Sequence, residues 1–340
     1  PRGYIIPSSQ KDFPTAVKFV NTLIRGGIKV EKAEGSFTVG DREYPEGSFI
    51  VRTAQAFRPH VLDMFEPQDY PNDFAYPGGP PIAPYDAAGW TLAYQMGVEF
   101  DRFQDNFDGP FRAIPYGEIQ KPGKVATGAG SGYVLPVAVN ESFLAVNMLL
   151  KEGAEVYRIK GSKTGVGPDA GSFYVAPGKT ADRILPDLGV GRAIQARELR
   201  GWKQGYLLER IHKPLRIALW DNYGGSMPSG WTRWLLEQFG FDFDVIYPKT
   251  IDEGDLKSRY DVLVFATRAI PAPGAGPGSR LKEEEVPEAH RFRMGSITAE
   301  KSVPQIKAFL EAGGKVIAMG SSTNLAYHLG LPVWNALTEI

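Results

Sequence analysis

The chain has 340 residues, of which 38 are basic and 39 acidic, and it contains no cysteine. Its hydrophobic fraction of 43% is ordinary for a globular protein and excludes a disordered, collagen-like or coiled-coil chain. The net charge of −1 gives no electrostatic reason to expect binding to nucleic acid or to an anionic membrane. The absence of cysteine excludes disulfides, a cysteine-ligated zinc site and a cysteine nucleophile in this chain. At about 150 residues per domain, the length predicts two or three domains.

The first residues read as structure rather than as a targeting segment. Gly3–Ile6 predicts a β-strand, and the charged segment and apolar run of a signal peptide are not visible. No stretch of about 18 apolar residues predicts a membrane span. Because the sequence opens inside a strand, we expect it to be a piece of a longer protein.

Two segments of the chain share short motifs in the same order. The matches are Gly3–Pro7 with Gly132–Pro136, Gly27–Val30 with Gly153–Val156, and Gly47–Val51 with Gly171–Val175. An amphipathic helical pattern separates the first two motifs of each segment, and the glycine after it suits a left-handed helix C-cap. The strand–helix–strand order predicts a right-handed crossover with parallel pairing. We interpret the segments as duplicated β-α-β-β units of an α/β fold, at 1–128 and 129–212.

A proline-rich segment, Pro67–Asp86, follows these motifs in the first unit. Its six prolines exclude a helix or a central strand. It also carries the aromatic residues Tyr70, Phe74, Tyr76 and Tyr85. The segment is either a ligand-facing loop or, as the simpler interpretation, an ordered loop whose rings pack over the scaffold.

Residues 213–340 predict a separate α/β domain. The most apolar strand patterns do not alternate with polar residues, which indicates strands buried on both faces of a parallel sheet. The order of strands and helices is typical of a flavodoxin-like, doubly wound fold, although such a sheet normally has about five strands and four are visible. The four are Leu215–Trp220, Phe243–Tyr247, Tyr260–Ala266 and Lys315–Met319. The domain is therefore expected to be truncated.

The segments between these strands predict two helices and an insertion. An apolar helical stripe after the first strand consists of Trp231, Trp234, Leu235 and Phe239, and a second helix is predicted over Val303–Ala312. Residues 268–299 are rich in proline, glycine and charge, and about thirty such residues inside a compact domain are unusual. We interpret this segment as a mobile or extended insertion whose charged run is a solvated face.

Parallel sheets bind ligands beyond the carboxyl ends of their strands, so the loops that follow the strands are candidate sites. The loop Asp221–Gly230 follows the first strand and could offer backbone N–H groups to an anion at the start of the next helix. It lacks the spacing of a P-loop or a dinucleotide fingerprint, and a turn with a serine or glycine cap is the simpler interpretation. The candidate ligand-binding residues here are Asp221, Asn222, Gly224, Gly225 and Ser226.

A second loop, Met319–Ala326, follows the fourth strand. A strand, a tight turn of small residues and a helix build a nucleophile elbow. The arrangement resembles the class I glutamine amidotransferase fold, whose cysteine would fall on Ser322 when the sequences are aligned on Gly320. A serine nucleophile needs a nearby base, and His328, on the same expected helix, is poorly placed for that role. We interpret the turn as a degenerate elbow and keep as candidate ligand-binding residues Ser321, Ser322, Thr323 and Asn324.

The histidines give no metal site by their spacing. They are His60, His212, His290 and His328, and none stands in a compact metal-ligand pattern. The spacing of His60 and Asp63 is a weak match, for which a surface histidine is the simpler interpretation. We expect no metal and no cofactor in this chain.

A resemblance to a known family is found in three neighbouring sequence segments, Thr53–Gln68, Pro71–Pro81 and Asp86–Leu92. They resemble the region after the catalytic domain in large bacterial zinc carboxypeptidases of the carboxypeptidase A-like family. Those proteins are typically exported and carry a C-terminal domain similar to class I glutamine amidotransferases. The resemblance covers nearly the whole chain, including Trp220–Gly225 and Ala318–Leu325.

The resemblance implies an accessory role for this chain. The family's zinc ligands and its glutamate base match no position here, and they would lie upstream of Pro1. Zinc is therefore expected only in a parent peptidase domain of the same polypeptide, in a secreted or periplasmic protein. The implied partners are that upstream domain and a peptide substrate.

Three functions remain open. The first is a non-catalytic accessory region that packs on, or positions, the peptidase domain or its substrate. The second is a stand-alone serine hydrolase or amidotransferase-like enzyme that uses Ser322. The third is a small-molecule or peptide-binding module that uses the Asp221 loop and the Ser321–Asn324 turn.

Overall fold

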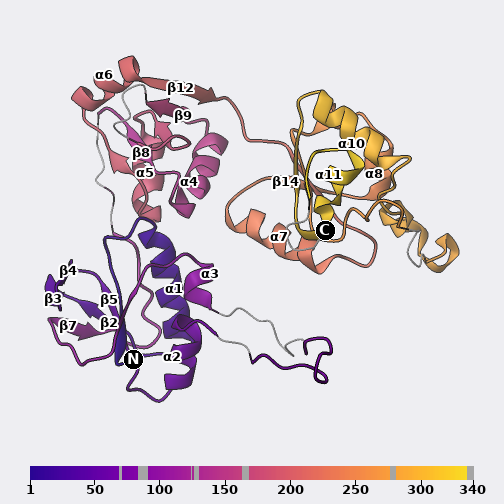
Figure 1. Ribbon diagram of the computed structural model, residues 1–340. Helices are drawn as coiled ribbons and strands as arrows, with labels where there is room; N and C mark the ends of the chain where they lie inside the picture. Colours follow the sequence, from indigo (N-terminus) through magenta and orange to yellow (C-terminus); the bar gives the residue numbers. More distant parts are fainter. Residues whose placement is uncertain are drawn as a thin grey trace. The chain divides into compact units, whose positions relative to one another are not determined.

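The computed structural model describes residues 1–68, 71–82, 91–123, 125, 130–162, 168–275 and 281–334 (Figure 1). The chain forms two compact units, Pro1–Ile211 and His212–Ile340. Both are mixtures of helices and strands, as the sequence predicts. Within the described ranges, no helix combines the length and the apolar character that crossing a bilayer requires.

The first sheet of the N-terminal unit has five strands, and every pairing in it is antiparallel. Their order is β6 (Asp101–Phe103), β1 (Gly3–Ile6), β5 (Phe49–Arg52), β2 (Glu31–Ala33) and β7 (Phe111–Ala113). The accompanying elements are α1 (Phe13–Arg25), α2 (Arg58–Phe65), α3 (Leu92–Gln95) and the hairpin of β3 (Phe37–Val39) and β4 (Arg42–Tyr44).

The second sheet of this unit is also five-stranded and antiparallel. Its strand order is β11 (Arg192–Ala193), β8 (Tyr133–Leu135), β10 (Phe173–Val175), β9 (Val156–Ser162) and β12 (Tyr206–Ile211). The helices are α4 (Asn140–Lys151), α5 (Lys179–Leu188) and α6 (Ala196–Gly205).

The predicted parallel pairing across each crossover is wrong. In the first sheet β5 lies between β1 and β2 and is antiparallel to both, and β10 has the same place between β8 and β9. The two strands joined by the crossover therefore run in the same direction but are not neighbours. Burial gives the physical reason: Phe49–Val51 is wholly buried and takes the central position, whereas Glu31 and Lys32 are partly exposed.

The helix α1 lies where the amphipathic pattern between Gly3–Pro7 and Gly27–Val30 predicts a helix. Asp12 accepts a hydrogen bond from the backbone N–H of Thr15 as N-cap, and Pro14 lies in the first turn, where a missing N–H costs nothing. The predicted left-handed glycine after the helix is confirmed, because Gly27 has a φ of 86°. The buried face consists of Pro14, Thr15, Ala16, Val17, Phe19, Val20, Leu23 and Ile24.

The carboxylate of Asp12 caps two helices. Its Oδ2 also accepts the backbone N–H of Asn140, the first residue of α4, at 3.1 Å. We expect Asp12→Ala to lower the free energy of unfolding of the N-terminal unit by about 2 kcal/mol, since two helix starts lose an acceptor. Urea denaturation would measure the change, and Asp41→Ala, at an exposed position, is the control. Equal stability of the two variants would contradict the shared cap.

The proline-rich segment departs from its simpler interpretation. Phe74 and Tyr76 are 45% and 63% exposed, so these rings do not pack over the scaffold as expected. The segment closes on itself instead, through a bridge between Phe74 and Pro81. Tyr70 and Tyr85 lie outside the described residues.

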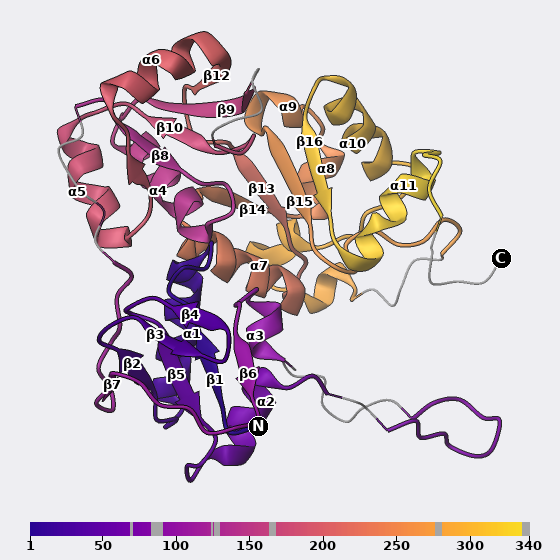
Figure 2. The same cartoon turned by 60° about the vertical axis from the view of Figure 1, so that its left-hand side comes forward.

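The C-terminal unit contains the predicted parallel sheet, with its four strands side by side in Figure 2. The two central strands are buried throughout, whereas the outer two are partly exposed. The order is β14 (Phe243–Ile246), β13 (Ile217–Trp220), β15 (Val262–Phe265) and β16 (Lys315–Ala318). The α-helices are α7 (Met227–Gln238), α8 (Pro248–Asp252), α9 (Leu256–Arg259), α10 (Ser302–Glu311) and α11 (Leu325–His328), and the 3₁₀-helices are η1 (Glu283–Glu285), η2 (Glu288–Arg293) and η3 (Gly320–Asn324).

Two expectations for this unit need correction. The stripe of α7 is not a buried face, because Trp231, Trp234 and Leu235 are 66%, 53% and 50% exposed. The segment 268–299 is not simply an extended insertion. Its apolar residues Ile270, Val286 and Ile297 are 1%, 1% and 2% exposed, and this burial ties the segment to the unit, while the charged run Glu283–Glu285 is solvated as expected.

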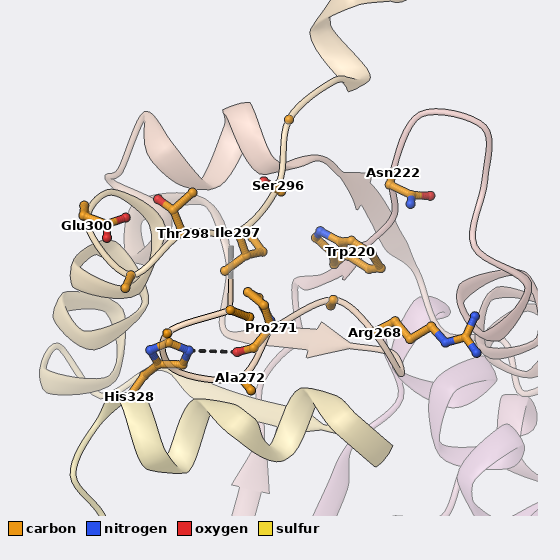
Figure 3. A pocket seen from close by; sticks show the side chains of 15 residues that line it. Trp220, Asn222, Arg268, Pro271, Ala272, Ser296, Ile297, Thr298, Glu300 and His328 are labelled. Carbon is orange, nitrogen blue, oxygen red and sulfur yellow. Dashed lines mark hydrogen bonds between the residues drawn. The ribbon is translucent and has the colours of Figure 1, made fainter. Parts of the chain in front are cut away.

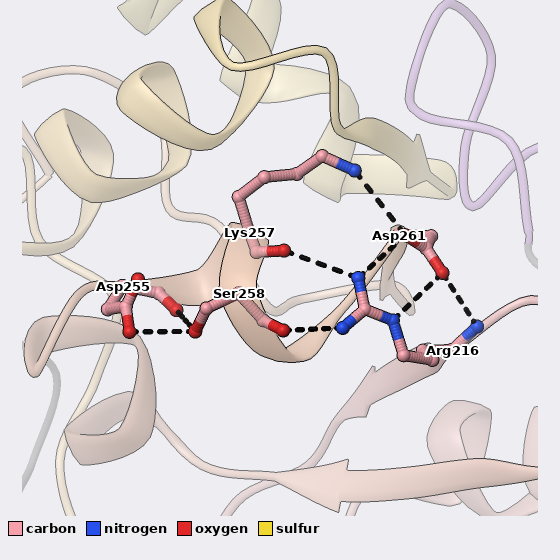
Figure 4. A network of polar contacts seen from close by, with 5 residues as sticks. All are labelled: Arg216, Asp255, Lys257, Ser258 and Asp261. Carbon is pink, nitrogen blue, oxygen red and sulfur yellow. Dashed lines mark hydrogen bonds and ion pairs between the residues drawn. The ribbon is translucent and has the colours of Figure 1, made fainter.

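An ion pair joins the start of β13 to the start of β15 (Figure 4). The guanidinium of Arg216 donates from Nε to Asp261 Oδ2 at 3.0 Å and from Nη2 to Oδ1 at 2.8 Å. The backbone N–H of Arg216 and the ammonium of Lys257 also donate to this carboxylate. These donors, Arg216 above all, hold the pKa of Asp261 well below its usual range.

The lowered pKa makes the contribution of the Asp261 carboxylate to folding stability depend on pH. This contribution is complete above the unfolded-state pKa of about 3.9 and is lost as the pH falls through the folded-state pKa. We expect Asp261→Asn to lower the free energy of unfolding by about 2 kcal/mol at pH 7. This difference in free energy from the unmodified chain should shrink below about pH 4. Urea denaturation between pH 3 and pH 7 would measure it. A difference that stays constant over this range would contradict the assignment.

Candidate functional site

A cavity lies where the central strands of the parallel sheet end. It has a volume of about 570 Å³ and is bordered by the end of β13, the loop after β15, the segment before α10 and the end of α11 (Figure 3). This is the edge at which open parallel sheets bind ligands. Its lining residues with polar or charged side chains are Trp220, Asn222, Arg268, Ser296, Thr298, Glu300 and His328.

Two buried polar atoms at this cavity lack a hydrogen-bond partner among the described residues. They are the indole Nε1 of Trp220 and the side-chain Oδ1 of Asn222. Trp220, the last residue of β13, is only 4% exposed and is labelled among the lining residues in Figure 3. A buried donor or acceptor without a partner costs about 1–3 kcal/mol. Both atoms have almost no accessible surface, so a guest molecule in the cavity bonds them only after a small movement of the lining.

Arg268 lies at the rim of the cavity and has an unusual backbone conformation. Its φ of 73° is in the left-handed region, which is uncommon for a residue other than glycine. Its backbone N–H donates to the hydroxyl of Ser321 at 3.0 Å, which fixes the turn. The guanidinium makes no ion pair within the described ranges, and neither does the carboxylate of Glu300.

The hydroxyl of Ser322 is fully engaged in the structure. The side chain is 0% exposed, and its Oγ donates to the carbonyl oxygen of Ala266. The same oxygen accepts the backbone N–H groups of Ala269 and Ile270 at 2.9 and 3.3 Å. The ring of His328 bonds the carbonyl oxygen of Pro271 at 2.9 Å instead of the serine. This geometry favours the degenerate elbow over a nucleophile.

The predicted turn residues do not line the cavity; three of them form hydrogen bonds to the loop after β15, which does. Ser321 and Ser322 bond the backbone of residues 268–270, and Asn324 Nδ2 donates to the carbonyl oxygen of Ile270 at 3.3 Å. Thr323 Oγ1 donates to the carbonyl oxygen of Gly320 at 2.7 Å, within the turn itself. Together these bonds place the loop that carries Arg268.

The Asp221 loop is closed by its own carboxylate. Asp221 Oδ1 accepts the backbone N–H groups of Asn222 and Ser226, both at 2.8 Å. A bound anion would need such N–H groups, but these two already donate to Asp221. The geometry therefore favours the capped turn over an anion site. Ser226 is the N-cap of α7 and accepts the backbone N–H of Ser229.

A smaller hollow of about 350 Å³ shares the lining residue Asn222 with this cavity. Arg293 contributes a buried Nε that has no partner among the described residues, and its guanidinium carbon lies 5.6 Å from the ring centre of Tyr247. Asp221, Gly224 and Gly225 line this hollow. Asn222 is thus the one predicted candidate that borders both cavities.

Sequence reasoning missed Trp220, Arg268, Glu300 and His328 as cavity residues. Trp220 ends β13 and Arg268 follows β15, so the rule for strand ends could have drawn attention to both. Glu300 lies between the segment interpreted as an insertion, 268–299, and α10, and only the folded chain brings it to this edge.

The described residues contain no group of three or more histidine, aspartate or glutamate side chains that could hold a metal ion. His60 lies near Gly26 rather than in such a group. Comparison with family models, with curated proteins and with solved structures gave no match. The resemblance to the zinc carboxypeptidase family therefore rests on the sequence phrases themselves.

Proposed function

We propose that this chain is a non-catalytic accessory region whose C-terminal unit binds a small polar ligand in the cavity at the carboxyl edge of the parallel sheet. The observation that carries the proposal is the pair of unpartnered buried atoms, Trp220 Nε1 and Asn222 Oδ1, at that cavity. A ligand with one acceptor and one donor pairs both once a small movement of the lining exposes them. The position at the ends of β13 and β15 supports the same site.

The proposal keeps the role implied by the sequence resemblance. The chain serves an upstream zinc peptidase domain of the same secreted or periplasmic polypeptide and packs on it or positions its peptide substrate. Zinc and the catalytic residues belong to that domain. The hydrogen bonds of Ser322 speak against the rival serine hydrolase or amidotransferase-like enzyme, because they occupy the oxygen that would attack.

The proposal also includes two finer features of the fold. We infer that the regions 1–128 and 129–212 are duplicates, and the equivalent strand orders of their sheets support this. We infer as well that the C-terminal sheet is a flavodoxin-like core, in line with its order β14-β13-β15-β16.

A thermal-shift screen of the whole chain tests the binding function. The probes are trialanine, its C-terminal amide and N-acetylglucosamine, each at millimolar concentration. A ligand that binds the folded state alone raises the Tm by mass action. Trp220→Phe deletes the indole N–H and keeps an aromatic ring, so we expect it to preserve the fold and to reduce the shift.

The matched control is Trp231→Phe, on the exposed face of α7. It should leave any ligand-induced shift unchanged. Absence of a shift with all three probes, or a shift that Trp220→Phe does not alter, would overturn binding at this cavity.

A further inference from the structure

We propose that the N-terminal unit binds a neutral saccharide in a cavity beside β6, an outer strand of its first sheet. The cavity has a volume of about 460 Å³, a size typical of small-molecule sites. It is bordered by the end of α2, by α3, by β6 and by the start of β4. Its charged lining residues are Arg42, Glu66, Glu99, Asp101 and Arg102. This site is separate from the cavity of the C-terminal unit, so it goes beyond the function proposed above.

The charges around the cavity favour a ligand without net charge. Arg42 Nη1 lies 2.6 Å from Asp101 Oδ1, and Arg102 Nε lies 2.8 Å from Glu66 Oε1. Each of these arginines is paired with a carboxylate, and the exposed Glu99 adds a third acidic group. An anionic ligand would meet three carboxylates and a cationic ligand two guanidiniums, and such like-charge contacts are unfavourable. A neutral polar molecule avoids both.

The pair of Glu66 and Arg102 leaves hydrogen-bonding atoms for a ligand. Glu66 uses the same oxygen, Oε1, to accept from the hydroxyl of Tyr4 at 2.5 Å and from Arg102 Nε. In the part of the chain that the structure describes, Glu66 Oε2 and the two terminal nitrogens of Arg102 have no hydrogen-bond partner. The two side chains are 23% and 42% exposed, so a ligand reaches them without a movement of the lining. A hydroxyl both donates and accepts, so the hydroxyls of a sugar match this neighbouring acceptor and donor.

Tyr94 adds an aromatic surface to the same cavity. It lies on α3 and is 57% exposed. The ring of Phe100 supports it, with the two ring centres 5.6 Å apart. An aromatic ring offers a flat apolar face against which the C–H groups of a pyranose can pack. An exposed ring next to fixed polar groups therefore matches a sugar, which carries C–H groups on its faces and hydroxyls around its rim.

The polar part of the site is held in place by the fold. The hydroxyl of the buried Tyr4 bonds the Glu66 carboxylate, and the hydroxyl of Thr91 donates to the Glu66 carbonyl oxygen at 2.6 Å. Arg102 lies directly opposite Tyr4 in the pairing of β6 with β1. Because these groups are already ordered, a ligand binds them with a smaller loss of conformational entropy.

Saturation-transfer difference NMR on the whole chain tests the site. The probes are the methyl β-pyranosides of glucose, galactose and mannose, titrated at millimolar concentrations. We expect saturable binding of at least one of them, and Tyr94→Ala should weaken it at least about fivefold because the stacking surface is lost. Tyr94→Phe keeps the ring and should retain most of the affinity. Tyr116→Ala, at a position 80% exposed and outside the cavity, is the matched control and should change nothing.

Glu66→Gln tests the polar contact. The amide oxygen can still accept from Tyr4 and Arg102, but an amide nitrogen replaces the free carboxylate oxygen. We expect at least about a threefold loss of affinity for the bound glycoside, since a charged acceptor is removed. Glu46→Gln, at an exposed position of the same unit, is the control. Circular dichroism melting of each variant shows that the fold is retained.

Several results would overturn this site. They are the absence of saturable binding with all three glycosides, an unchanged affinity in Tyr94→Ala, and equal affinity for glucitol, an open-chain polyol without a ring face. Competition by inorganic phosphate would indicate an anion site on the arginines instead. A loss of glycoside binding in Trp220→Phe but not in Tyr94→Ala would place the sugar in the cavity of the C-terminal unit, which supports the proposed function and contradicts this second site.

Discussion

Replacing Ser322 with alanine is expected to lower the free energy of unfolding of the C-terminal unit by about 3 kcal/mol. The substitution removes one hydrogen bond to Ala266 and leaves the buried N–H groups of Ala269 and Ile270 without an acceptor. Each buried group left unpaired costs about 1–3 kcal/mol. Native-state hydrogen exchange of the residues in β15 and β16 would report the loss for this unit alone, which matters because the two units need not unfold together.

Ser321→Ala is the control for this experiment. Ser321 is exposed and accepts a single N–H, that of Arg268, so its loss should cost less than about 1 kcal/mol. The unmodified chain should also resist labelling by a fluorophosphonate, since the Ser322 hydroxyl is buried and already bonded. Labelling that disappears in Ser322→Ala would contradict the structural role and restore the enzyme alternative.

Phe65→Ala is expected to lower the free energy of unfolding of the N-terminal unit by about 3–5 kcal/mol. The ring is fully buried at the end of α2 and stacks on Tyr4 with centroids 4.1 Å apart. Phe19 and Phe100 contact it edge-on at 5.3 and 5.1 Å. Alanine would leave a cavity at the point where α1, α2 and the sheet meet. Urea denaturation followed by far-UV circular dichroism would measure the change.

Two further variants show whether packing is the cause. Phe65→Leu keeps most of the volume and should recover at least half of the loss. Tyr116→Ala, at a position 80% exposed, should remain within about 0.5 kcal/mol of the unmodified chain. Similar costs for Phe65→Leu and Phe65→Ala would indicate that the ring stacking, not the filled volume, dominates.

Local patterns in the sequence predicted several of the elements. The stripe of α1 and the left-handed glycines, with φ of 86° at Gly27 and 74° at Gly153, appear in the structure as expected. The four strands of the C-terminal sheet and their parallel pairing were predicted as well. These features depend on residues close in sequence or on the continuous burial of a strand, which the sequence displays directly.

The candidate site was predicted in part. Asn222 was among the predicted residues and lines the cavity. Ser321 and Ser322 were also predicted, but they bond the backbone of the loop after β15 and do not line the cavity. Whether a hydroxyl is free or bonded depends on which backbone groups the fold brings to it. For Ser322 those groups are more than 50 residues away in the chain. The turn motif alone therefore could not distinguish a nucleophilic serine from one whose hydroxyl only stabilises a loop.

The sequence by itself determined the α/β class, the position of α10 to within one residue and the absence of cysteine chemistry, because composition and short-range periodicity carry this information. Only the tertiary structure decided that β5 and β10 insert between the strands of each crossover and that Arg268, Trp220 and Glu300 share one cavity. Strand order and side-chain convergence are set by long-range competition for burial and for hydrogen-bond partners. No local pattern in the chain records the result of that competition.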